Sequence, residues 1–142
     1  MIIGAGIDIV DNDRIEKILK KYGTRFKKKC FSEMEIKKSD AKINPYYSYA
    51  KRYAAKEACA KAMGTGLARG VKWKDIEVQN NIYGKPYITL HKNAEKIINK
   101  LSKNNFNIVV SLSDVAKYSI ANVIIYKKWT IKIIYFLMSN LL

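Results

Sequence analysis

Two acidic residues, far apart in the sequence, carry the side chains that a hard metal ion binds. Asp8 lies in a short apolar run near the start of the chain, and Glu57 lies in a long alanine-rich segment. Mg²⁺ commonly binds one or two carboxylates and completes its coordination with water and substrate phosphates. Asp8 and Glu57 are therefore candidate metal ligands, and a pyrophosphate substrate would complete such a site.

Basic residues near Glu57 suit the same chemistry. Tyr53, Glu57 and Lys61 follow one another at intervals of one helical turn, and Arg52 and Lys56 form a second pair at this spacing. Cations hold phosphate groups and stabilise the charge that develops during phosphoryl transfer. Lys61 is a candidate for stabilising or protonating a departing phosphate, and Arg52 and Lys56 are candidates for holding others. The alternative is that Glu57 and Lys61 form an ordinary surface ion pair.

The apolar run that contains Asp8, residues 2–10, alternates as a β-strand does, because successive side chains of a strand point to opposite faces. One face is apolar, and the other carries two glycines, Asp8 and Val10. A carboxylate on a covered face needs an ion pair, a hydrogen bond or a metal. Asp8 is thus expected to project from the glycine face, either as a metal ligand or as a turn or cap residue at the end of the strand.

A long helix is predicted over residues 46–63, which are rich in alanine, contain neither glycine nor proline, and precede Gly64-Thr65-Gly66. Glu57 and Lys61 both lie within it. Alanine recurs at every fourth position of this segment, which permits close approach of another element: Ala50, Ala54, Ala58 and Ala62.

The remaining segments predict a chain of mixed helices and strands. Capping residues at 11–13 precede a helix over 14–22 that Gly23 ends, and Ser32 with Glu35 is typical of a second helix start. The second half predicts strands 76–79 and 87–90, a helix over 93–101, and strands 108–112 and 118–126 around a connection at 113–117. This order indicates an α+β fold, a small single domain with a long central helix packed on a largely antiparallel sheet.

The chain is strongly basic. It has 142 residues, enough for one domain, and a formal net charge of +15. Residues 14–42 hold eleven Lys or Arg against four Asp or Glu, which indicates either a solvated basic surface or a docking face for an acidic partner. A small basic nucleic-acid-binding protein is the main alternative, with tyrosines near Lys51 and Arg52 for stacking. That alternative leaves Asp8 and Glu57 unexplained, and a compositional bias of the genome accounts for the charge equally well.

Cysteine usage and hydropathy indicate a reduced, cytoplasmic protein. Cys30 and Cys59 have neither CxxC spacing nor neighbouring histidines, so no disulfide or zinc site is expected. No secretory leader is recognisable. The apolar run 133–138 is too short to span a membrane, and the last segment is open to three interpretations: an interfacial helix, a packed tail or a tail buried in an oligomer.

Several motifs, in this order, resemble holo-acyl-carrier-protein synthases, which are 4′-phosphopantetheinyl transferases. They are Gly6-Ile7-Asp8-Ile9-Val10, Arg52-Tyr53-Ala54-Ala55-Lys56-Glu57-Ala58 with Lys61-Ala62, Gly64-Thr65-Gly66, and Gly84-Lys85-Pro86-Tyr87. The resemblance covers residues 1–126 and leaves 127–142 as an apolar and basic C-terminal extension. It implies the 4′-phosphopantetheinyl transferase fold, assembled as a homotrimer with active sites at subunit interfaces.

The resemblance also implies a reaction. Coenzyme A would supply 4′-phosphopantetheine to a serine of an acidic acyl carrier protein, in support of fatty acid biosynthesis, and release adenosine 3′,5′-bisphosphate. Mg²⁺ is the implied cofactor, and the serine proton would pass to Glu57 or to a metal-bound water. The assigned residues are Asp8 and Glu57 for metal and catalysis, Lys61 for catalysis, Arg52, Lys56, Lys61, Gly64 and Thr65 for coenzyme A, and Arg14, Lys17, Lys21 and Arg25 for docking of the carrier protein.

The match has two departures, one in a late strand and one in the tail beyond Tyr126, which exceeds the usual domain. Asp114 stands where many members have a histidine, so a histidine contact to coenzyme A is not expected at that position. His91, the only histidine, follows a predicted strand and is expected to be a surface or packing residue. A non-catalytic binding module that kept the fold is a third possibility, against which the presence of Asp8, Glu57 and Lys61 argues.

Overall fold

The structure is a computed structural model, and it describes residues 1–128 of the chain. The expected extension over 127–142 therefore lies almost wholly outside the described residues. The elements are β1 (Ile2–Asp11), α1 (Asn12–Cys30), α2 (Glu33–Asp40), α3 (Pro45–Ala62), the short 3₁₀ helix η1 (Trp73–Asp75), β2 (Ile76–Asn80), β3 (Pro86–Leu90), α4 (Lys92–Ser102), β4 (Asn107–Val115) and β5 (Tyr118–Tyr126).

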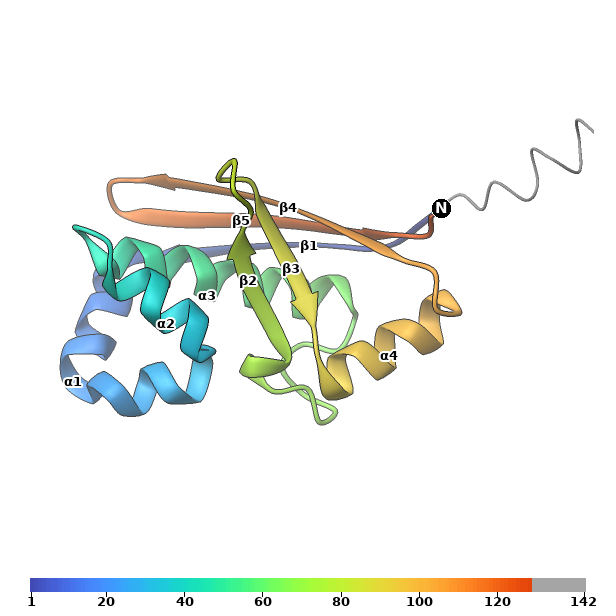
Figure 1. The fold of residues 1–142 in the computed structure, drawn as a ribbon, viewed down its shortest axis with the longest axis horizontal. Helices are drawn as coiled ribbons and strands as arrows, with labels where there is room; N and C mark the ends of the chain where they lie inside the picture. The colour runs from blue at the N-terminus through green and yellow to red at the C-terminus, as the bar shows by residue number, and fades with distance from the viewer. Residues whose placement is uncertain (129–142) are drawn as a thin grey trace, which may run out of the picture.

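Two antiparallel sheets surround one central helix. Strands β1, β5 and β4 pair in that spatial order, and β2 pairs with β3 in a separate hairpin. Helix α3 lies along the three-stranded sheet, α1 and α2 lie at one end of the molecule, and α4 lies at the other (Figure 1). This arrangement confirms the predicted α+β fold with a long central helix and antiparallel strands.

Strand β1 lies against α3 because both surfaces consist of small residues. A Cβ atom built on Gly4 would lie 1.9 Å from the carbonyl oxygen of Ala62, and one built on Gly6 would lie 2.0 Å from that of Ala58. No side chain larger than hydrogen fits at either glycine without moving the helix. The alanine repeat of α3 and the glycines of β1 are therefore the two halves of one contact, which fixes the separation between Asp8 and Glu57.

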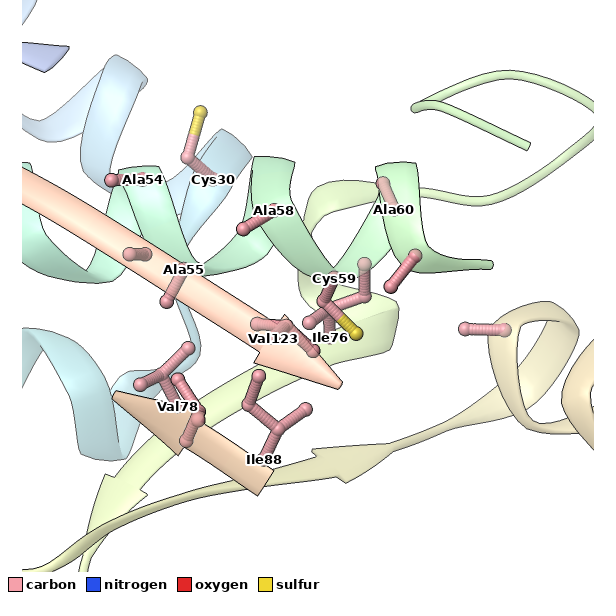
Figure 2. Close-up of a cluster of buried hydrophobic side chains, with 14 of the residues drawn as sticks. Cys30, Ala54, Ala55, Ala58, Cys59, Ala60, Ile76, Val78, Ile88 and Val123 are labelled. Atoms are coloured by element: carbon pink, nitrogen blue, oxygen red, sulfur yellow. The ribbon is translucent and has the colours of Figure 1, made fainter. Parts of the chain in front are cut away.

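The hydrophobic core lies between α3 and the two sheets. Alanines and Cys59 of α3 pack beside Ile76 and Val78 of β2, Ile88 of β3 and Val123 of β5 (Figure 2). Both cysteines are buried and free, and burial raises the pKa of the Cys30 thiol to about 11 and that of Cys59 to about 12. Thiols with such high pKa values react slowly.

Two elements are longer than the sequence indicates. The predicted helix over 14–22 begins instead at Asn12, where the Asp11 carboxylate caps it. It continues to Cys30 beyond a kink at Gly23, whose φ of 45° favours glycine. Strand β4 includes residues 113–115, so the predicted connection over 113–117 shrinks to a turn at 116–117.

Within the part of the chain that the structure describes, no helix combines the length and the apolar composition that crossing a bilayer requires.

Candidate active site

Asp8 projects from the face of β1 that α3 covers, together with Gly6 and Val10. The antiparallel register places Asp8 opposite Ala121 of β5, the one strand that pairs with β1 in the described chain. The Lys61 ammonium lies 2.8 Å from Asp8 Oδ1 and also donates to the carbonyl oxygen of Ile7 at 3.1 Å. The predicted position of Asp8 on the glycine face is confirmed, and its carboxylate has a cation beside it.

Glu57 lies on the side of α3 that faces this carboxylate. Burial raises the pKa of Glu57, and the negative charge of Asp8 raises it further, whereas the charges of Lys61 and Arg14 lower it. Like charges have this effect only when they lie close together, since their interaction falls with distance. The structure therefore brings together Asp8, Glu57 and Lys61 from a strand and a helix that are distant in the sequence.

Tyr53 adds a hydroxyl to the same cluster. Its ring stacks on Trp73 with a centroid separation of 4.4 Å and also contacts Phe26, and Tyr53 is one of the groups that lower the pKa of Glu57. Burial, followed by the charge of Glu57, raises the pKa of Tyr53 to about 12. The spacing of one helical turn between Tyr53 and Glu57 is visible in the sequence, but the stacking of Trp73 on the Tyr53 ring is not.

The two carboxylates fit a magnesium ion that also binds its substrate. Groups of three or more His, Cys, Asp or Glu side chains that could hold a metal do not occur among residues 1–128. A site built from Asp8 and Glu57 alone leaves most coordination positions for water and phosphate, as Mg²⁺ prefers. The Lys61 ammonium beside Asp8 demonstrates that a positive charge is accommodated at this carboxylate.

Arg52 lies in a different place, at the wall of a large cavity. The cavity has a volume of about 1150 Å³, and its lining includes α3, β2 and the end of β4. The Arg52 side chain is only 7% exposed, and its Nη1 donates to the hydroxyl and carbonyl oxygens of Ser48. Its Nε is buried and has no hydrogen-bond partner within the described residues. Leaving this donor of a buried cation unpaired is costly. The positive charges of Arg52 and Lys51 in the lining make the cavity suited to an anion.

The structure contradicts the assignment of Lys56 to a phosphate. The side chains of Lys56 and Glu35 are both 0% exposed, and their charged groups are 2.9 Å apart. Lys56 also donates to the carbonyl oxygens of Trp73 and Ile76, which occupies its remaining donors. This lysine therefore has neither a free donor nor a path to a ligand, because its partners lie in the core.

The other assigned residues are accessible. Gly64, with a φ of 71°, and Thr65 form the turn that ends α3, beyond Lys61. Four cations of α1 are exposed and form no ion pair in the described chain: Arg14, Lys17, Lys21 and Arg25. His91 precedes α4, and its Nε2 lies 3.0 Å from Glu77 Oε2, so it occupies a structural position as predicted.

The amino-acid sequence matches a known protein family and several of its members. Residues 4–123 match the family model of the 4′-phosphopantetheinyl transferase superfamily. A holo-[acyl-carrier-protein] synthase of Sinorhizobium fredii is 58% identical over 63% of this chain and 65% of its own length. The enzyme of the same name from Rhizobium rhizogenes is 45% identical over 80% of this chain and 84% of its own length.

Solved structures resemble the fold over most of its length. Holo-[acyl-carrier-protein] synthase from Neisseria meningitidis has a TM-score of 0.79 and 32% identity, and the match covers 89% of this chain and all of that one. The Helicobacter pylori enzyme in complex with coenzyme A has a TM-score of 0.75 and 32% identity, covering 86% of this chain and 99% of that one. These relatives give no support to the nucleic-acid-binding alternative. By its sequence and its fold, the chain belongs to the 4′-phosphopantetheinyl transferase superfamily.

Proposed function

We propose that this chain transfers 4′-phosphopantetheine from coenzyme A to a serine of apo-acyl carrier protein, giving holo-acyl carrier protein and adenosine 3′,5′-bisphosphate for fatty acid biosynthesis. The observation that carries this proposal is the convergence of Asp8, Glu57 and Lys61 at the contact between β1 and α3. The relatives bear the name of this activity, and one related structure holds coenzyme A.

In this reaction the serine oxygen bonds to the phosphorus that carries pantetheine, and the bond from that phosphorus to the bridging oxygen breaks. Asp8 and Glu57 would hold Mg²⁺, which when bound neutralises charge on the pyrophosphate. Lys61 is more than half exposed at its side chain, so its ammonium can turn from Asp8 to the leaving phosphate. Glu57, whose pKa is raised by burial and by Asp8, is suited to accept the serine proton.

Coenzyme A would contact a second group of residues. The cationic guanidinium of Arg52 belongs to the lining of its cavity, which supports binding of a nucleotide phosphate there. Gly64 and Thr65, which follow α3 beyond Lys61, would contact coenzyme A as well. Lys56 is not part of this proposal, because its donors are used in the core.

The decisive experiment is incubation of the purified protein with Mg²⁺, coenzyme A and apo-acyl carrier protein, followed by mass spectrometry of the carrier protein. A mass increase of one phosphopantetheine group is expected, and it should require both coenzyme A and the divalent ion. A carrier protein whose mass stays unchanged over a range of pH and metal concentration would refute the proposed activity.

A homotrimer with active sites between subunits is part of the proposal. The face of β1 opposite α3 exposes Ile7 by 61% and Ile9 by 60%, and the register adds Ile120 and Ile124 of β5 to the same face. Exposed apolar area of this kind is typical of an interface. Light scattering is expected to give three times the mass of one chain, and Ile9→Lys is expected to lower it. Met34→Lys, at an exposed residue of α2, is the matched control. A monomeric wild-type protein would contradict the trimer.

The exposed cations of α1 are proposed to dock an acidic carrier protein. Arg14→Glu is expected to raise the KM for carrier protein about tenfold, because charge reversal slows encounter with an acidic partner, and to leave the KM for coenzyme A unchanged. Since Arg14 also lowers the pKa of Glu57, Lys21→Glu provides a second variant farther from the carboxylates. Steady-state kinetics in both substrates checks the prediction. Lys100→Glu on α4 is the control, and equal increases in both KM values would contradict docking.

A further inference from the structure

The cavity beside Arg52 contains an ion pair between residues that are distant in the sequence. Of the charged side chains that line it, Lys38, Lys42, Lys51 and Arg52 are cations and Asp114 is a carboxylate. Lys51 Nζ lies 2.8 Å from Asp114 Oδ1. Lys51 belongs to α3 and Asp114 to β4, so the pair links the helix to the far end of the strand.

This pair contributes little to the stability of the fold. The Lys51 side chain is 33% exposed and that of Asp114 is 36% exposed. Ion pairs with this much solvent contact stabilise proteins by less than about 1 kcal/mol. The carboxylate of Asp114 by itself repels an anionic ligand. Asp114 can therefore favour the binding of an anion only through its effect on Lys51.

The geometry gives Lys51 donors for a ligand. A lysine ammonium has three N–H donors, and Asp114 accepts from one of them. The carboxylate restrains a side chain that otherwise moves freely, which lowers the entropy lost when the ammonium binds a phosphate. Arg52, the next residue on α3, adds a second positive charge to the lining of the same cavity.

We propose that Lys51 is an anion-binding residue of this cavity and that Asp114 is a positioning residue that holds the Lys51 ammonium in place. The ligand group is a phosphate of the nucleotide half of coenzyme A. This inference rests on the proposed function, which places that nucleotide beside Arg52. Asp114, the residue that departs from the histidine of many related sequences, thus acts on the substrate through Lys51.

The test is titration of the purified full-length chain with adenosine 3′,5′-bisphosphate by isothermal calorimetry. Lys51→Met and Asp114→Asn are each expected to weaken binding by about threefold to tenfold, and the double variant is expected to bind no more weakly than Lys51→Met. The differences should shrink as salt is added, because both groups are partly exposed. Adenosine, which lacks phosphate, should show no difference between variants.

A matched ion pair outside the cavity gives the control. Lys20 and Glu16 of α1 lie 2.6 Å apart, and Lys20→Met and Glu16→Gln are expected to leave bisphosphate binding unchanged. Any one of three results would overturn this inference alone. They are equal bisphosphate binding by wild type and Lys51→Met, tighter binding by Asp114→Asn, and an effect of Asp114→Asn that persists in the Lys51→Met background. A wild-type protein that binds no bisphosphate overturns the proposed function and this inference with it.

Discussion

Asp8→Asn or Glu57→Gln is expected to lower the rate of phosphopantetheine transfer by about a thousandfold or more. Each change removes one negative charge and keeps nearly the same shape, so a metal ion at this site loses half of its protein ligands. Asp8→Asn also removes the carboxylate that Lys61 contacts. Glu57→Gln additionally removes the group that is proposed to accept the serine proton. Single-turnover transfer followed by mass spectrometry measures both losses.

The same two variants are expected to remain folded. Asp8 and Glu57 repel each other, since the charge of Asp8 raises the pKa of Glu57. Neutralising either carboxylate removes this repulsion, so the midpoint of thermal unfolding should stay at the wild-type value or increase. An inactive variant with an unchanged midpoint therefore assigns the loss to the site and not to the fold.

Metal binding provides a readout that is independent of turnover. Mn²⁺, titrated in place of Mg²⁺ and followed by electron paramagnetic resonance, is expected to bind more weakly to both variants than to the wild type. Glu95→Gln, at an exposed carboxylate of α4, is the matched control and should bind Mn²⁺ and transfer normally. Full activity or unchanged Mn²⁺ binding in either variant would remove that residue from the metal site.

The sequence predicts the central features of this site because they arise from local patterns. Alternation in residues 2–10 places Asp8 with the glycines, and helical periodicity places Glu57 one turn before Lys61. The alanines of α3 indicate close approach, and the structure identifies β1 as the partner. Each of these inferences needs only the period of one element, which the sequence carries directly.

The sequence fails where a side chain depends on a distant partner. Lys56 and Arg52 are both cationic and lie one turn apart, yet the Lys56 ammonium lies in the core, where it pairs with Glu35 of α2. The pairing of Lys51 with Asp114 likewise joins residues of separate elements. Periodicity places a residue on a face of its own helix, but the element that covers that face is set by tertiary packing.

Lys56→Met tests the structural assignment of Lys56 against the one made from the sequence. Its ammonium balances a fully buried carboxylate, which also accepts hydrogen bonds from the backbone N–H groups of Ser32 and Val78. Removing one partner of a buried pair leaves an uncompensated charge, and the expected loss is about 3–5 kcal/mol of the free energy of unfolding. Urea denaturation measures it. Lys100→Met, at an exposed position of α4, should change stability by less than about 0.5 kcal/mol.

A second substitution at Glu35 separates the charge from the hydrogen bonds. Adding Glu35→Gln to Lys56→Met removes the buried charge and retains one acceptor, so part of the lost stability should return. Adding Glu35→Leu removes the charge as well but leaves the N–H groups of Ser32 and Val78 without an acceptor, and it should restore less. Equal recovery in the two double variants would show that those hydrogen bonds contribute little.

The kinetics of Lys56→Met separate the two assignments completely. A phosphate-binding lysine would leave stability nearly unchanged and raise the KM for coenzyme A when replaced. A structural lysine predicts the reverse: a large loss of stability with little change in that KM, provided the assay is run where the variant is folded. A lower kcat is also expected, because Lys56 holds the carbonyl of Trp73, whose ring stacks on Tyr53, and Tyr53 lies one helical turn before Glu57 and lowers its pKa. Through these contacts the buried ion pair of Lys56 and Glu35 supports the position of the Glu57 carboxylate.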